Sequence, residues 1–141
     1  MAAVTITSGN VTLVSGNALH GQKVDVATGA GKVVYFDSTT GKWSRAQGDG
    51  TEAEAGQYGL GVLLSSTAGD NQITSVAVEG CIVSYGAIFA AGGVYIIGDT
   101  AGDIYPFADA GSGDQVTVIG LAISTSQLMI KPIYNAGAVI A

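Results

Sequence analysis

Short stretches of β-branched and aromatic residues recur along the whole chain, with clusters of turn-forming residues between them. The stretches are residues 11–14, 32–36, 60–64, 73–78 and 116–119. Clusters rich in Gly, Asn, Asp, Ser and Thr lie at residues 8–10, 15–17, 39–41, 68–71 and 111–114. Short strands at this spacing are typical of antiparallel sandwiches and barrels. No segment carries a sustained helical period, and the most that fits is one helical turn at residues 87–91. The pattern predicts an all-β fold.

The predicted strands differ in how their two faces are patterned. Residues 5–7 and 24–26 alternate between apolar and polar side chains, as expected of strands with one wet face. Residues 92–97 and 120–123 are instead apolar on both faces. In a domain this small, the second apolar face requires a cover. A neighbouring subunit or partner could supply it, and so could a second sheet or the closure of a barrel.

The chain also contains an internal echo. Residues 31–43 resemble residues 92–104, and each segment reads as a strand, an Asp/Thr/Gly turn and a second strand. Each is followed by a similar closing segment, residues 60–65 in the first half and 119–124 in the second. Two copies are too few for a solenoid. The echo predicts a duplicated hairpin unit within one sandwich.

Length and composition limit the possible architecture. The chain has 141 residues, which suits a single domain over residues 1–141. Hydrophobic residues make up 48% of it and charged residues only 11%, which excludes a disordered chain. We therefore expect a single small antiparallel β-sandwich or jelly-roll-like barrel. No apolar run approaches the length of a membrane span, and the N-terminus carries no signal-peptide pattern.

Charge argues against two classes of partner. The formal net charge is −6, and the five basic residues are scattered along the chain. They are Lys23, Lys32, Lys42, Arg45 and Lys131. Proteins that bind nucleic acid or acidic membranes cluster their Lys and Arg against phosphates. We expect neither nucleic acid nor a membrane as partner.

A search for catalytic or metal-binding residues finds little. His20 and Cys81 are the only histidine and the only cysteine, and an imidazole could activate a thiol. However, Cys81 lies in the apolar run 78–83, where it is expected to pack as a small hydrophobe. One Cys and one His are also too few for a zinc site. We expect no catalytic site, no cofactor and no enzymatic activity.

The carboxylates favour turns over metal binding. Residues 49–54 form the densest acidic group and could bind Ca²⁺ weakly, but they lack the ligand ladder of an EF-hand loop. Four aspartates stand beside glycine in turn clusters, where Asp bonds its own backbone. These are Asp70, Asp99, Asp103 and Asp114. Residues 29–32 resemble the end of a phosphate loop, but Val26 and Val33 stand at two required positions.

Aromatic side chains offer a further candidate surface. They could line a sugar-binding face by stacking, although their positions in predicted strands favour a core or a subunit interface. The residues are Tyr35, Trp43, Tyr58, Tyr95 and Tyr105.

A set of motifs spread over residues 31–132 resembles the capsid decoration, or cement, proteins of tailed bacteriophages. The motifs are Val34-Tyr35-Phe36-Asp37, Gly41-Lys42-Trp43, Leu60-Gly61-Val62, Val78-Glu79-Gly80-Cys81-Ile82-Val83, Ala91-Gly92-Gly93-Val94-Tyr95-Ile96, Gly102-Asp103-Ile104, Ile119-Gly120-Leu121-Ala122-Ile123-Ser124 and Ile130-Lys131-Pro132.

The resemblance implies a structural virion protein without enzymatic activity. Such a protein forms homotrimers on the outer surface of the assembled shell, between capsomers, and stabilises it. The implied partners are the major capsid protein and further copies of the chain itself. The protein would be made in the host cytoplasm.

Two terminal segments are candidate interfaces, because both are apolar or neutral and lie outside the echoed hairpins. They are residues 1–9 and 135–141. One of them would order as an added strand against the shell or a neighbour. Deleting residues 2–8 should then weaken shell binding with little effect on the melting temperature. The alternative for residues 1–9 is an ordinary first strand of the sandwich.

A different function stays open beside this one. The chain could be a carbohydrate-binding β-domain of a phage head fibre or tail adhesin. Trp43 would then provide a stacking platform, or residues 49–54 a calcium-linked sugar site.

Overall fold

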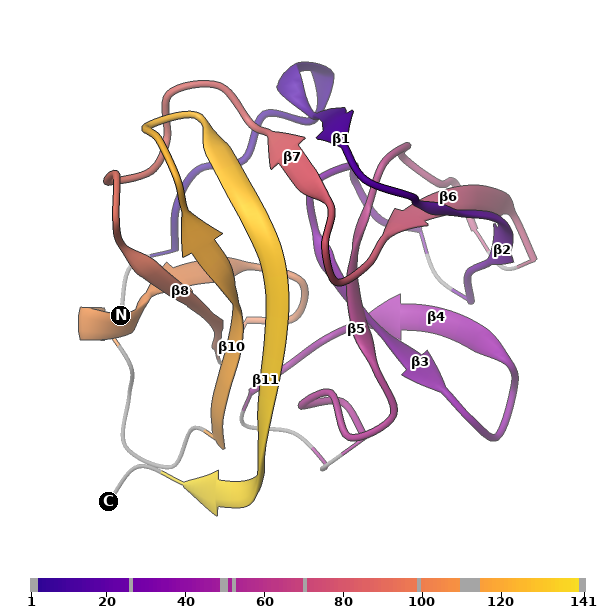
Figure 1. Ribbon diagram of the computed structural model, residues 1–141. Helices are drawn as coiled ribbons and strands as arrows, with labels where there is room; N and C mark the ends of the chain where they lie inside the picture. The colour runs from indigo at the N-terminus through magenta and orange to yellow at the C-terminus, as the bar shows by residue number, and fades with distance from the viewer. Residues whose placement is uncertain are drawn as a thin grey trace.

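The computed structural model describes residues 3–25, 27–48, 51, 53–69, 71–98, 100–109 and 115–139. Strands and two short 3-10 helices account for its regular structure (Figure 1). The strands are β1 (Thr12–Ser15), β2 (Leu19–Lys23), β3 (Val33–Asp37), β4 (Lys42–Arg45), β5 (Leu60–Leu63), β6 (Ile73–Ala77), β7 (Ile82–Ser84), β8 (Val94–Ile97), β9 (Ile104–Pro106), β10 (Gln115–Ala122) and β11 (Gln127–Val139). The 3-10 helices are η1 (Ser8–Asn10) and η2 (Phe107–Asp109).

The strands form two antiparallel sheets. One sheet has the order β1-β7-β11-β10-β8-β9, and the other has the order β2-β6-β5-β3-β4. In Figure 1 the strands β7–β11 lie together on the left and β2–β6 on the right. The prediction of an all-β, antiparallel fold is confirmed, and the arrangement is consistent with a β-sandwich.

The two halves of the chain repeat one topology. If the five strands of each half are numbered along the chain, both halves have the spatial order 1-5-4-2-3. This order is β2-β6-β5-β3-β4 in the first half and β7-β11-β10-β8-β9 in the second. The strand pairing repeats as well: Val34 lies opposite Gly61 in the first half, and Tyr95 lies opposite Gly120 in the second. The predicted hairpins of residues 31–43 and 92–104 are therefore confirmed as β3–β4 and β8–β9, and the repeat extends beyond them to five strands.

The glycines of the hairpin turns explain part of this local similarity. Gly41 and Gly102 have φ values of +72° and +83°, in the left-handed region that glycine adopts at little cost. Each occupies the same place in the turn of its hairpin, just before β4 or β9. An L-residue there would strain the turn, so both halves keep glycine.

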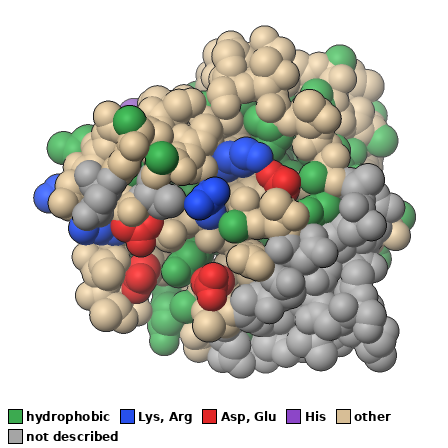
Figure 2. All heavy atoms as spheres, turned by 180° about the vertical axis from the view of Figure 1, so that it is seen from behind, with side chains coloured by type: hydrophobic (Ala, Val, Ile, Leu, Met, Phe, Trp, Pro, Cys, Tyr) green, Lys and Arg blue, Asp and Glu red, His purple; other side chains and the backbone are tan. Residues whose placement is uncertain are grey.

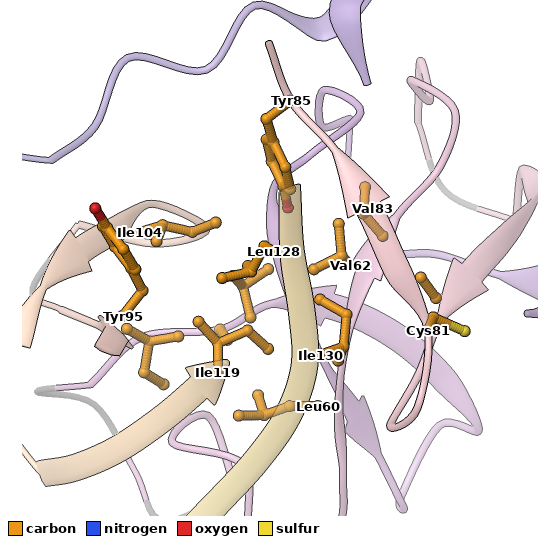
Figure 3. Close-up of a cluster of buried hydrophobic side chains, with 14 of the residues drawn as sticks. Leu60, Val62, Cys81, Val83, Tyr85, Tyr95, Ile104, Ile119, Leu128 and Ile130 are labelled. Carbon is orange, nitrogen blue, oxygen red and sulfur yellow. The ribbon is translucent and has the colours of Figure 1, made fainter. Parts of the chain in front are cut away.

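Two groups of buried side chains make up the core. The smaller one lies inside the first half and contains Val24, Val34, Trp43, Leu63 and Val76. The larger one joins both sheets, and Figure 3 shows side chains of β5, β10 and β11 converging in it. Alternate residues of β11 and of the hairpins point into these cores, which is the period-2 pattern expected of strands.

Two predictions of local structure were wrong. Residues 5–7 and 24–26 do not form strands, although Val24 makes an isolated bridge to Trp43 and residue 26 lies outside the described residues. Residues 87–91 form no helical turn. In these short segments the local pattern is overridden by tertiary context.

Candidate interaction surface

The outer face of β8, β10 and β11 is apolar and open. Val94 on β8 is 40% exposed, Ile123 just after β10 is 44% exposed, and Ile133 on β11 is 52% exposed. A shallow hollow of about 350 Å³ lies on this face. Its lining residues are Val94, Val118, Gly120, Leu121, Lys131 and Ile133. We call these residues the outer patch.

Strand alternation produces the outer patch. On β11, Leu128 and Ile130 are fully buried in the larger core, so Lys131 and Ile133 face outward. The segments 92–97 and 120–123 were expected to need a cover on a second face. On that second face Val94 and Ile123 stay exposed, whereas Ile96 of β8 is only 1% exposed, so the face is open in part. Exposed apolar patches mark sites of association.

Charge on the outer patch is sparse. Lys131 is the one charged side chain among its lining residues. Its aliphatic stem can lie along the apolar surface while the ammonium stays in water. On the face of the molecule seen in Figure 2, basic and acidic side chains lie intermingled and form no basic stripe.

His20 and Cys81 have separate surroundings. Cys81 is fully buried in the larger core, where it is close to the backbone of Gly16. His20 is exposed, and its Nδ1 lies 2.7 Å from the hydroxyl of Ser75. The thiol is thus packed as a small hydrophobe, as the sequence predicted, and the imidazole does not activate it.

The acidic group at residues 49–54 lies partly outside the described residues, which omit 49, 50 and 52. Glu54 accepts hydrogen bonds from the backbone N–H and the hydroxyl of Thr51, at 3.1 and 3.0 Å. Of the other singled-out aspartates, Asp70, Asp99 and Asp114 also lie outside the described residues. Within the described part of the chain, no cluster of three or more His, Cys, Asp or Glu side chains is placed to hold a metal ion.

Asp103 pairs with the lysine of the phosphate-loop-like segment. Its carboxylate accepts a hydrogen bond from Nζ of Lys32, and the two residues form a salt bridge. Asp103 lies just before β9 and Lys32 just before β3, so this ion pair joins the two hairpins. The segment 29–32 therefore serves the contact between the halves.

Most of the singled-out aromatic side chains are structural. Trp43 is only 5% exposed, donates from Nε1 to the side-chain oxygen of Gln22 at 3.0 Å, and packs edge-on against Phe36. Tyr95 and Tyr105 are each 3% exposed, whereas Tyr58 is 54% exposed. Trp43 is therefore buried in the first half and is no stacking platform for a sugar.

The N-terminal segment lies against the second half. The backbone N–H of Val4 donates to the carbonyl oxygen of Ile104 on β9 at 2.9 Å, and Val4 and Ile6 pack on the larger core. Asp25 makes the corresponding bond to Trp43 on β4 at 3.1 Å. The second strand of each hairpin therefore accepts a backbone hydrogen bond at the equivalent residue: Ile104 from Val4, and Trp43 from Asp25.

At the C-terminus, residues 135–139 continue β11, and residues 140 and 141 lie outside the described residues. Residues 1 and 2 also lie outside them. Whether either terminal segment contacts a shell stays a prediction.

The sequence pattern did not lead to a prediction of β11, which contributes two of the six residues of the outer patch, Lys131 and Ile133. The signal was present in the apolar positions 128, 130, 132 and 134, which follow a two-residue period on either side of Lys131. Comparisons with known proteins add no further assignment, because no family model, curated protein or solved structure matches the chain. Among the described residues, no helix is long and apolar enough to cross a membrane.

Proposed function

We propose that this protein is a capsid decoration protein of a tailed bacteriophage. In this role it binds the outer surface of the assembled shell as a homotrimer between capsomers, and it stabilises the shell without catalysis. Its partners are the major capsid protein and its own copies, and its location is the virion surface. The motif resemblance supports this proposal. The observation that carries it is the outer patch, an apolar sheet face left open in a small and weakly charged domain.

The physical mechanism is linkage between binding and assembly. A protein that binds only the assembled lattice lowers the free energy of that state by RT ln(1 + [L]/Kd) per site, or about 2.7 kcal/mol at a hundredfold excess over Kd. A trimer that touches several capsomers adds multivalency, so each modest contact holds the others in place. Because little charge is buried, such contacts avoid the cost of desolvating ions.

The first test is the copy number of the chain in purified particles from its source, measured by quantitative mass spectrometry against the major shell protein. The proposal expects copies comparable in number to the shell subunits. A handful of copies per particle would instead indicate a fibre or vertex component, and absence from particles would overturn the proposal.

A second test measures shell binding directly. Purified protein is added to shells that lack it, and co-sedimentation is recorded at low and at high salt. We expect saturable binding that changes little with salt, because charged residues make up only 11% of the chain and screening acts on charges. A glycan array with and without calcium tests the carbohydrate-binding alternative, and specific sugar binding without shell binding would favour that alternative.

A further inference from the structure

The internal repeat allows the outer patch to be compared with the equivalent face of the first half, which is packed against the second half. In the first half, the side of β3, β5 and β6 that faces the second half is covered at four strand positions, although Ile73, on the same side of β6 as Ala77, is 64% exposed. Val33, Val62 and Ala77 are fully buried there, and Leu60 is 4% exposed. All four belong to the larger core, which also contains inward-facing side chains of β10 and β11. The outward side of the first half is thus covered by the inward side of the second.

The strand register shows which residues of the second half correspond to the covered residues of the first half. The cross-strand pair Val33–Val62 of the first half corresponds to the pair Val94–Leu121 of the second half. The corresponding positions are Val33 and Val94, Leu60 and Val118, Val62 and Leu121, and Ala77 and Met129. Three of the four second-half residues line the outer patch. The outer patch is therefore the counterpart of a surface that is buried in the first half.

The internal contact shows which kind of surface fits this shape. Two different faces meet in it: the outward face of one half and the inward face of the other. A contact between unlike faces, repeated from one molecule to the next, forms a ring when the rotation closes and an open filament when it does not. The inward face of the second half is buried in the larger core of every copy, so a further copy would have to cover the outer patch with a different apolar surface.

Charge also favours a second copy as the occupant. The chain carries a net charge of −6, so copies repel one another except where acidic groups are sparse. Among the lining residues that the structure describes, Lys131 is the one charged side chain, and it is a cation. The outer patch therefore attracts the acidic surface of another copy and buries apolar area at the same time.

We propose that the outer patch is an interface between copies of this chain. The proposal rests on the proposed function and deepens it, because it names the surface through which the decoration protein assembles with itself. Each copy presents its outer patch to a different surface of the next copy.

The test uses the purified full chain without shells. Sedimentation equilibrium and native mass spectrometry over a range of concentrations give the oligomeric mass and the dissociation constant. The variants Val94→Glu and Ile133→Glu each place an acid on the outer patch, and each is expected to raise the dissociation constant at least about tenfold. Ile73→Glu is the matched control, because Ile73 is 64% exposed on β6 of the other sheet. Circular dichroism and thermal unfolding establish that every variant is folded.

A second measurement requires no substitution. Amine acetylation, read by mass spectrometry above and below the assembly concentration, compares Lys131 with Lys23, which is exposed on β2. We expect acetylation of Lys131 to slow in the assembled protein relative to Lys23. Equal rates at both concentrations would overturn the proposal.

Two further results would also overturn the proposal: a monomeric wild-type protein, or assembly that survives Val94→Glu and Ile133→Glu but not Ile73→Glu. Because no shells are present, these outcomes are separate from failure of the proposed function. A protein that assembles through the outer patch but does not bind shells would refute shell decoration alone. A monomer that binds shells would refute the interface and the trimeric state, and would leave shell binding intact.

Discussion

Tyr85 offers a sharp test of how the two halves are held together. It follows β7, its side chain is fully buried, and its hydroxyl donates a hydrogen bond to the carbonyl oxygen of Gly31 at 2.9 Å. Gly31 precedes β3, so this bond joins the second half to the first. Its ring also packs edge-on against Phe89, with ring centroids 5.1 Å apart. Tyr85→Phe keeps the ring contact and removes only the hydroxyl.

The expected loss follows from burial. Removing the donor takes a hydrogen bond away from a carbonyl inside the protein, which costs about 1–3 kcal/mol of unfolding free energy. Equilibrium urea unfolding, followed by the fluorescence of Trp43, measures this loss, because Trp43 is the single tryptophan and is buried. Tyr58→Phe is the matched control: Tyr58 is 54% exposed, so its variant should stay within about 0.5 kcal/mol of wild type.

The same hydroxyl predicts a dependence on pH. Burial raises the pKa of Tyr85 well above its ordinary value of about 10, so the folded protein keeps the proton that the unfolded chain loses. The stabilising contribution is complete below pH 10 and falls by about 1.4 kcal/mol for each pH unit above it. Phenylalanine has no such proton. The gap between wild type and Tyr85→Phe should therefore narrow by about 1.4 kcal/mol between pH 8 and pH 11.

The difference in unfolding free energy between wild type and Tyr85→Phe isolates the contribution of the Tyr85 hydroxyl. Burial and the Asp37 carboxylate also raise the pKa of Tyr35, but Tyr35 is present in both proteins and its contribution cancels. A gap that stays constant from pH 8 to pH 11, or a loss below about 0.5 kcal/mol at pH 8, would refute the assignment of a buried, hydrogen-bonded hydroxyl.

Three further predictions concern the packing of other segments. Gly120→Ala should lower the unfolding free energy by about 2 kcal/mol or more, because a Cβ there would overlap the carbonyl oxygen of Met129. Gly9→Ala is the control, since no atom lies within 4 Å of a Cβ at that position. Equal urea midpoints for the two variants would contradict the prediction. Deleting residues 2–8 should lower the melting temperature by about 3 °C or more in circular dichroism, since the segment packs on the larger core, and an unchanged melting temperature would refute that packing. The buried thiol of Cys81 should react with a disulfide reagent at least ~100 times more slowly in the folded than in the unfolded protein, and a rapid reaction would contradict its burial.

The deletion prediction differs from the one that the sequence supports. The pattern of residues 1–9 alone predicts a segment whose removal leaves the melting temperature nearly unchanged. The bond between Val4 and Ile104 and the packing of Ile6 predict a stability loss instead. Local sequence could not reveal this contact, because about a hundred residues separate its two sides and only the closed tertiary structure brings them together.

The burial of the cysteine and of some aromatic side chains could be predicted from the sequence around them. Burial of Cys81 was predicted correctly from the apolar residues around it. Packing in a core or subunit interface was favoured for Trp43 and Tyr95, and the structure buries both in cores. Tyr58, which the sequence pattern groups with them as a strand residue, lies instead in a turn before β5 and is exposed.

The all-β class, the positions of β3, β5, β6 and β10, and the paired hairpins were determined by the sequence itself. Period-2 patterning, β-branched residues and glycine turns act within a few residues of one another, so each can be read locally. The tertiary structure alone decided that the repeat extends to five strands in each half and that the second half covers the first. It also decided which apolar face stays open. Val33 and Val94 occupy equivalent strand positions, yet one is fully buried and the other is 40% exposed, because only the first has a sheet packed over it.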